Sequence, residues 1–211
     1  KRARTLTLSF LTGFFLGLSL IVAIGAQNTF LLRQGILGQH VFSVALFCSL
    51  SDTLLIIIGI AGISFFLNNF ISEISNILYG ISALWLIGYG ILRLKAALKS
   101  DELIKIESSA SKDWLTTISI AAVLTFANPH VYLDTMVLIG SVSQQFSGYD
   151  KISFTIGACL ASFIFFFSLT YGSKLLAPLM MRPNSWRVLD SLIALIMFTI
   201  AFKLASIGNW L

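Results

Sequence analysis

The stretch LTFANPHVYLDTM, residues 124–136, places polar groups inside a segment that is otherwise apolar enough to cross a lipid bilayer. An Asn128-Pro129 pair is followed by a histidine, a tyrosine and Asp134. Proline cannot donate the backbone hydrogen bond of a helix, and its ring clashes with the preceding turn. The residue before a proline is also biased away from helical backbone. The sequence therefore predicts a helix that breaks at Pro129, with polar side chains gathered at the break.

The composition of the whole chain indicates what surrounds this break. The 211 residues are 57% hydrophobic and 11% charged, whereas soluble domains are about half apolar and about a quarter charged. A helix of about 20 apolar residues spans the hydrocarbon core. Lipid offers the backbone no hydrogen-bond partner, so a spanning segment must satisfy its own backbone groups as a helix. Such spans are expected over residues 5–32, 41–67, 74–92, 114–133, 152–173 and 188–209. We expect an all-α integral membrane protein with six transmembrane helices in a single domain, residues 1–211.

A polar connection over residues 99–111 divides the chain near its middle, with three expected spans on each side. A unit with an odd number of spans inserts its second copy upside down, which is the inverted-repeat plan of many transporters. The sequences GAQN (25–28) and FANP (126–129) place an asparagine at corresponding positions of the first span of each half. We therefore expect two inverted three-helix repeats, over residues 1–98 and 112–211.

Asp52 lies near the middle of the span over residues 41–67. An unpaired carboxylate at that depth costs at least about 2.5–3.5 kcal/mol on insertion scales. One interpretation is an aspartate that Ser49 or Ser51 holds and that joins helices. The other is a functional site, which is the default for an acid inside a membrane.

Two complementary features are expected near Pro129. The helix that resumes at His130 would present free N–H groups and a positive dipole end, which suit a carboxylate. Asp134 follows at about 7–8 Å along a helix that rises 1.5 Å per residue, so the spacing fits the two ends of a small zwitterion. The alternative is a simple kink in which Asn128 satisfies the loosened carbonyls. His130 itself could carry protons or only bond a carbonyl.

Gly25, Ala26, Gln27 and Asn28 form a similar interruption without a proline. Their amide groups could line a cavity or join helices by hydrogen bonds. The basic residues lie at the ends of spans, where they act as topology signals and not as a nucleic-acid surface. No metal-ligand spacing, nucleophile elbow or Walker loop is present, so we expect neither an enzyme nor a bound metal or cofactor. Small residues over 79–90 and 155–162 suit close helix packing and are compatible with a homodimer.

The same residues carry a resemblance to a known family. The segments IGAQNTFLLRQGI (24–36), FANPHVYLDTMVLIGS (126–141) and WRVLDSLIALIMFTIAFKLA (186–205) resemble the lysine/arginine exporter family (the LysE family), especially its arginine-exporting ArgO branch. The resemblance implies a multi-pass protein of the bacterial inner membrane that exports amino acids, basic ones in this branch. The site residues that it implies are Gln27, Asn28, Asp52, Asn128, Pro129, Tyr132 and Asp134. Where family members usually have Gly-Pro-Gln-Asn, this chain has Ala26 in place of the proline.

A mechanism follows from these residues and the resemblance together. Two aspartates within the lipid would compensate an ammonium or guanidinium, while amides and helix ends take the α-carboxylate and α-amine. Moving one positive charge outward costs about 2.3 kcal/mol per 100 mV of interior-negative potential. We expect alternating access with proton antiport, with Asp52, Asp134 or His130 as the proton carrier. The alternatives are an uncoupled channel or facilitator, an exporter of neutral amino acids, and a membrane assembly or sensor protein.

Overall fold

The computed structural model of the chain describes residues 2–22, 25–66, 71–98, 113–176, 178, 183–207 and 210. These residues form helices and contain no strand. In chain order the elements are α1 (Arg2–Ile21), α2 (Ala26–Leu37), α3 (Val41–Phe66), α4 (Ile71–Leu98), α6 (Trp114–Phe126), α7 (Pro129–Tyr132), the π-helix η1 (Leu133–Leu138), α8 (Ile139–Ser143), α9 (Gly148–Gly172), the 3-10 helix η2 (Ser173–Leu176) and α10 (Pro183–Ile207). The polar connection expected over residues 99–111 lies outside the described residues.

The helices have the length and composition of membrane spans. Among the described residues, five stretches are long and apolar enough to cross a bilayer, namely Arg2–Ile21, Val41–Gly62, Tyr79–Leu98, Gly148–Leu176 and Arg187–Ile207. A sixth span results when Trp114–Phe126 and Pro129–Ser143 count as one helix bent by 60°. Large apolar side chains face outward, as for Leu84 on α4 and Val188 on α10. The expected all-α membrane protein is confirmed.

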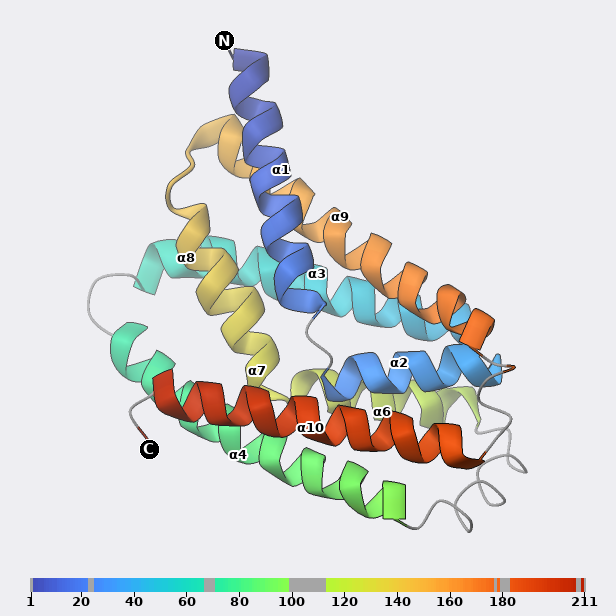
Figure 1. Cartoon of the computed structure of the whole chain (residues 1–211). Helices are drawn as coiled ribbons and strands as arrows, with labels where there is room; N and C mark the ends of the chain where they lie inside the picture. The colour runs from blue at the N-terminus through green and yellow to red at the C-terminus, as the bar shows by residue number, and fades with distance from the viewer. Residues whose placement is uncertain are drawn as a thin grey trace.

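Two of the expected spans are interrupted near the middle of the molecule. The first, predicted over residues 5–32, is not one helix, because α1 ends at Ile21 and α2 begins at Ala26. The fourth breaks as predicted, since α6 ends at Phe126 and α7 begins at Pro129. Figure 1 shows that α1 runs from the periphery to the start of α2, and that α6 runs inward to the start of α7. The two breaks therefore bring four helix ends to the centre.

Close packing fixes the helices around these breaks. A Cβ atom on Gly13 of α1 would collide with the carbonyl of Phe154 on α9, and one on Gly157 of α9 would collide with the carbonyl of Phe10. The small residues expected to allow close approach in this part of the chain therefore do so. On the other side of the centre, α3 lies against η1, where a Cβ on Gly59 would lie 2.5 Å from the Cα of Met136.

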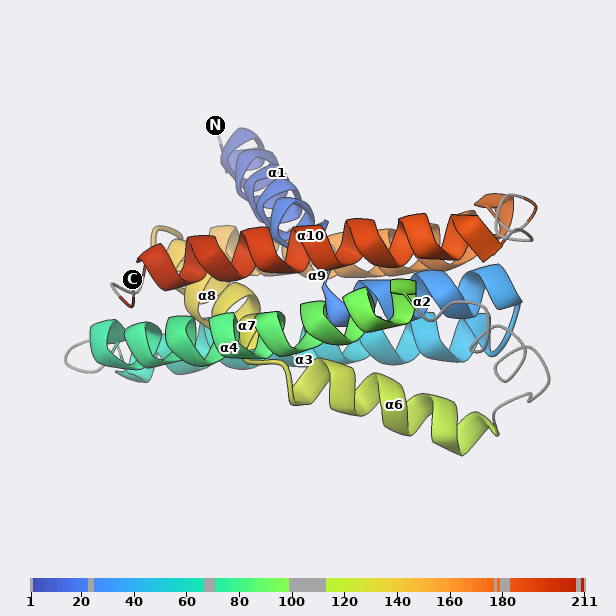
Figure 2. The same cartoon turned by 60° about the horizontal axis from the view of Figure 1, so that its bottom comes forward.

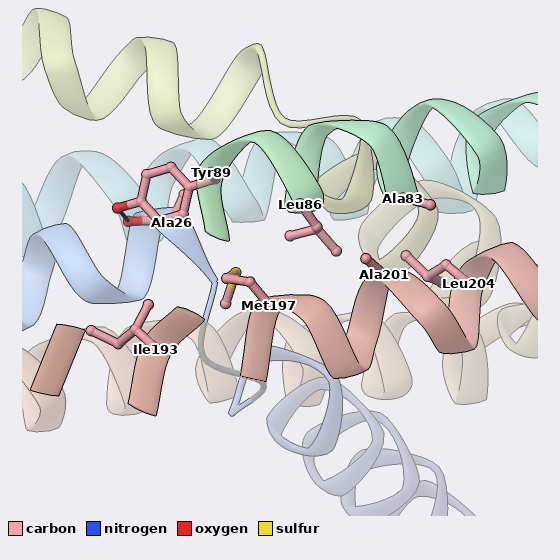
Figure 3. Close-up of a cluster of buried hydrophobic side chains, with 8 residues drawn as sticks. All are labelled: Ala26, Ala83, Leu86, Tyr89, Ile193, Met197, Ala201 and Leu204. Carbon is pink, nitrogen blue, oxygen red and sulfur yellow. Dashed lines mark hydrogen bonds between the residues drawn. The ribbon is translucent and has the colours of Figure 1, made fainter. Parts of the chain in front are cut away.

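The helices α4 and α10 form an antiparallel pair along one side of the molecule, as Figures 1 and 2 show. Their shared core includes Leu86 and Tyr89 from α4 with Ile193 and Met197 from α10. Ala26, the first residue of α2, is fully buried in the same cluster (Figure 3). The start of α2 is thus held between α4 and α10.

Candidate functional site

A cavity of about 50 Å³ lies where the two helix breaks meet. It is lined by Leu20, Ile21, Gly25, Gln27, Asn28, Asp52, Asn128, His130, Val131, Asp134, Thr135 and Phe166. Most of the residues predicted for a transport site are therefore gathered around one space. Pro129 and Tyr132 do not line it. Pro129 is the first residue of α7, and the Tyr132 side chain forms a hydrogen bond across the break to α6. None of the lining residues is a lysine or an arginine.

Asp52 projects from α3 and is only 3% exposed. Its described hydrogen-bond partner is Ser162 on α9, whose Oγ donates to Oδ2 at 3.3 Å. In the alternative interpretation Ser49 or Ser51 would hold Asp52, but the Ser49 hydroxyl donates instead to the Ala45 carbonyl at 2.8 Å. A serine within a helix reaches the carbonyl one turn back more readily than a neighbouring side chain. Asp52 is therefore buried beside a neutral hydroxyl and has no described cationic partner.

Asp134 approaches the same cavity from the first turn of η1. Its Oδ2 lies 2.9 Å from Nδ1 of His130, one turn earlier, and both side chains are half-buried. His130 therefore does more than bond a backbone carbonyl, because its ring contacts a carboxylate. A short π-helix at this position is common at functional sites. The cavity thus contains two carboxylates from different helices and one imidazole.

Each helix break is bridged in the same way. The side-chain amide of Asn28 on α2 donates to the carbonyl of Ile21, the last residue of α1, at 2.7 Å. The hydroxyl of Tyr132 on α7 donates to the carbonyl of Phe126, the last residue of α6, at 2.8 Å. In both cases a side chain from the second helix satisfies a carbonyl that the first helix leaves open. Asn28 and Tyr132 therefore hold the two breaks in shape.

The two helix starts differ in a way that corrects the sequence interpretation. Asn128 caps α7, since its side chain accepts from the N–H of His130 at 3.1 Å. Its carbonyl accepts from the N–H of Val131 at 3.2 Å. The expectation that the segment resuming at His130 presents free N–H groups is wrong for this conformation, because Asn128 occupies them.

Of the two helix starts at the breaks, that of α2 has no side-chain cap. Its N-cap residue is Gly25, and no side chain there accepts a hydrogen bond from the first turn. The two N-cap residues are thus Gly25 and Asn128, so Ala26 corresponds to Pro129 as the first helical residue. Asn28 and Asn128, expected at corresponding positions, instead differ by three residues in register.

Gln27 is the buried polar residue nearest to this uncapped start. It is 5% exposed, and its Nε2 has no hydrogen-bond partner among the described residues. The thiol of Cys48 lies beside it, and sulfur is only a weak acceptor. Sequence reasoning named Gly25 only as part of the first interruption and did not identify Thr135, Ser162 or Phe166 as part of the site. The sequence feature that could have pointed to Ser162 is a hydroxyl within a span that has no charged residue, but a serine there is equally compatible with simple helix packing.

The sequence as a whole matches the model of the LysE type translocator family over residues 18–208. The chain belongs to the LysE type translocator family. Among its relatives, the arginine exporter protein ArgO of Salmonella typhimurium is 38% identical over 197 residues, covering 93% of this chain and 92% of that protein. ArgO of Photorhabdus laumondii is 36% identical over 201 residues, covering 95% and 96%. The putative amino-acid transporter YggA of Aeromonas salmonicida is 36% identical over 196 residues, covering 93% and 95%.

No solved structure matches the chain. Membership of the LysE type translocator family makes this protein a membrane transporter and not an enzyme. The apolar helices agree with this conclusion. Family membership and the bacterial relatives place the protein in the inner membrane.

Proposed function

We propose that this LysE-family protein exports basic amino acids, arginine or lysine, through the central cavity. Amino-acid export is supported by the family and by the names of the relatives. The basic substrate class is supported by the charge of the cavity. Asp52 and Asp134 line it from two helices, and no lysine or arginine does. Burying a carboxylate without a charged partner, as at Asp52, is costly, and a travelling cation would offset that cost.

The size of the cavity supports a cycle that opens and closes. A volume of about 50 Å³ holds about one or two water molecules, whereas small-molecule pockets measure about 300–1,000 Å³. An amino acid can therefore enter only after helices move apart. Discontinuous helices at the centre of two repeats are the usual hinges and binding points of alternating-access transporters. The breaks at α1–α2 and α6–α7 fall in the first span of each predicted repeat, over residues 1–98 and 112–211, and favour this plan.

The charge of the substrate favours coupling to protons. Export of one positive charge against an interior-negative potential costs about 2.3 kcal/mol per 100 mV, and exchange for a proton removes that electrical cost. Asp134 already contacts His130 at 2.9 Å, whereas the described hydrogen-bond partner of Asp52 is a neutral serine. We therefore assign to Asp52 the alternate binding of substrate cation and proton, with Asp134 and His130 completing the site.

The first experiment measures export by variants of the two aspartates. Asp52→Asn and Asp134→Asn keep the shape of each side chain and remove the negative charge that the cation requires. Each should reduce efflux of labelled arginine from proteoliposomes to the level of empty liposomes, with normal amounts of protein. Asp113→Asn is the matched control, because Asp113 is exposed at the start of α6 and lies outside the cavity. Loss of folded protein in the two cavity variants would favour aspartates that only join helices.

The second experiment tests the coupling. Arginine efflux is measured in proteoliposomes under a pH gradient of either sign, with the membrane potential clamped. Antiport predicts faster efflux when the receiving side is acidic and slower efflux when the gradient is reversed. Efflux that ignores the gradient would remove the antiport mechanism and leave the binding site intact. A rate that fails to saturate with arginine would instead indicate a facilitator.

A further inference from the structure

We propose that the uncapped N-terminus of α2, together with the Gln27 side chain, binds the α-carboxylate of the exported amino acid. This inference rests on the proposed function and adds a second recognition point to the same cavity. Its consequence is a requirement on the substrate: a free carboxylate must accompany the basic side chain.

The backbone at the start of α2 is open for an anion. α2 has 12 residues, and its N-cap residue Gly25 lines the cavity without supplying a capping side chain. The first N–H groups of a helix have no partner within it, and the helix dipole adds partial positive charge at this end. A carboxylate near Gly25 would accept from the N–H of Gln27, the second helical residue.

The Gln27 side chain is the independent observation that points to a ligand. It lines the cavity and only 5% of its surface is exposed. Its Nε2 lacks a hydrogen-bond partner among the described residues. A buried amide donor without an acceptor is costly, and such groups in native structures usually meet a ligand, ion or water. A carboxylate that bridges the backbone N–H and the Nε2 of Gln27 would satisfy both donors.

The charges of the cavity make the requirement testable. Asp52 and Asp134 alone would attract a dication at least as well as a monocation. Agmatine, which is arginine without its carboxylate, carries two positive charges, whereas arginine carries a net charge of one. Preference for arginine over agmatine therefore needs donors aimed at the carboxylate. Those donors are the ones at the start of α2.

The experiment compares three probes with full-length protein in proteoliposomes. Inhibition of labelled arginine efflux is measured with unlabelled arginine, agmatine and arginine methyl ester. We expect agmatine and the ester to compete at least about tenfold more weakly than arginine, the effect of losing one charged hydrogen bond. Equal competition by all three would overturn the carboxylate site. Absence of arginine efflux in the unmodified protein would instead overturn the proposed function.

Two substitutions locate the site on α2. Gly25→Ser supplies a hydroxyl that can cap the N–H of Gln27, while Gly25→Ala adds the same carbon without the oxygen. An added Cβ at Gly25 meets nothing within 4 Å, and the backbone is extended (φ −100°), so both variants should fold. We expect Gly25→Ser to bind arginine about tenfold more weakly than Gly25→Ala, with agmatine competition equal in the two.

Gln27→Leu provides a second readout, because it removes the amide donor and keeps a similar volume. The substitution should weaken the binding of arginine and leave the competition by agmatine unchanged. Equal arginine affinity for Gly25→Ser and Gly25→Ala, or a Gln27→Leu effect of the same size on arginine and agmatine, would overturn the proposal.

Discussion

The contact between Asp52 and Ser162 ties the most buried carboxylate of the cavity to a helix of the other half of the chain. The Ser162 hydroxyl is fully buried on α9 and donates to Oδ2 of Asp52 on α3 at 3.3 Å. Hydrogen bonds to charged groups contribute about 1.5–3 kcal/mol each. A hydroxyl that donates to a carboxylate stabilises its charged form, which is the form that the proposed cation binding at Asp52 requires.

Replacing this serine gives a prediction at the scale of one residue. Ser162→Ala should raise the arginine concentration for half-maximal efflux about tenfold, because Asp52 loses its hydroxyl donor. The matched control is Ser168→Ala, which removes an exposed hydroxyl from the same helix. Efflux kinetics in proteoliposomes distinguish the two. If the arginine concentration for half-maximal efflux were the same in both variants, a role for Ser162 in the site would be contradicted.

Single residues also show how far sequence reasoning reached into the site. Asp52 and Asp134 could be predicted because a charge within an apolar run is costly and therefore conspicuous. Ser162 could not, since a serine can satisfy itself within its own helix, and its pairing depends on α3 packing against α9. The capping role of Asn128 was similarly hidden, because an asparagine before a proline can act on either helix end.

At the scale of helical elements, the first break forms without a proline because several weaker features act together. Gly25 supplies an extended N-cap with φ −100° and ψ −177°. The Asn28 side chain satisfies the carbonyl of Ile21 across the break, and Ala26 is buried between α4 and α10 (Figure 3). The sequence predicted an interruption at GAQN (25–28), and the structure confirms a break in this span but places it earlier, between Ile21 and Gly25, because Ala26, Gln27 and Asn28 already belong to α2. What the sequence left open was its depth, because that depends on the packing of Ala26.

The correspondence of Ala26 with Pro129 gives a prediction for this break. Both are the first residue of a helix, where the N–H group has no partner in the helix and proline is favoured. Ala26→Pro should therefore raise the free energy of unfolding by about 0.4–1 kcal/mol, by restricting the unfolded chain. Arginine efflux should persist, since the N–H of Gln27 is unchanged. Thermal unfolding in detergent, together with efflux, checks both statements.

A proline elsewhere in the same helix is the control for this effect. Leu32→Pro lies in the interior of α2, where proline removes a helical hydrogen bond and costs about 3 kcal/mol or more. It should lower the unfolding temperature or prevent accumulation of the protein. If Ala26→Pro behaved like Leu32→Pro, the residue would not occupy the first position of a helix.

At the scale of the whole molecule, the packing joins the two halves of the chain and does not separate them. α3 packs against α9 and α4 packs against α10, while α1 runs along α9. The apolar character of the spans could be predicted from the sequence, and their number agrees with the six expected when the bent pair Trp114–Phe126 and Pro129–Ser143 counts as one span. The pairing of helices across the halves could not, because it depends on contacts such as Gly13 with Phe154 and Gly59 with Met136. Those contacts decide which polar residues share the central cavity.

One ion pair connects this cross-half packing to the start of α2. Nη1 of Arg93 on α4 lies 3.4 Å from Oδ1 of Asp190 on α10. The Arg93 guanidinium also lies 4.9 Å from the centre of the Tyr89 ring. The Tyr89 hydroxyl in turn donates to the carbonyl of Ala26 at 3.5 Å. Arg33 on α2 is also within electrostatic range of Arg93 and Asp190. Asp190 therefore offsets the repulsion between Arg93 on α4 and Arg33 on α2.

Removing that carboxylate should destabilise the whole bundle. Asp190→Asn leaves the guanidinium groups of Arg93 and Arg33 without the negative charge that acts on both, and we expect a loss of about 1.5–3 kcal/mol in the free energy of unfolding. Arg93→Gln combined with Asp190→Asn should cost less than the sum of the two single substitutions, because the second change also removes the repulsion. Thermal unfolding of the four proteins in detergent measures this coupling. Additive losses would show that Arg93 and Asp190 act independently, and that the tie between α4, α10 and the start of α2 depends on apolar packing around Ala26 alone.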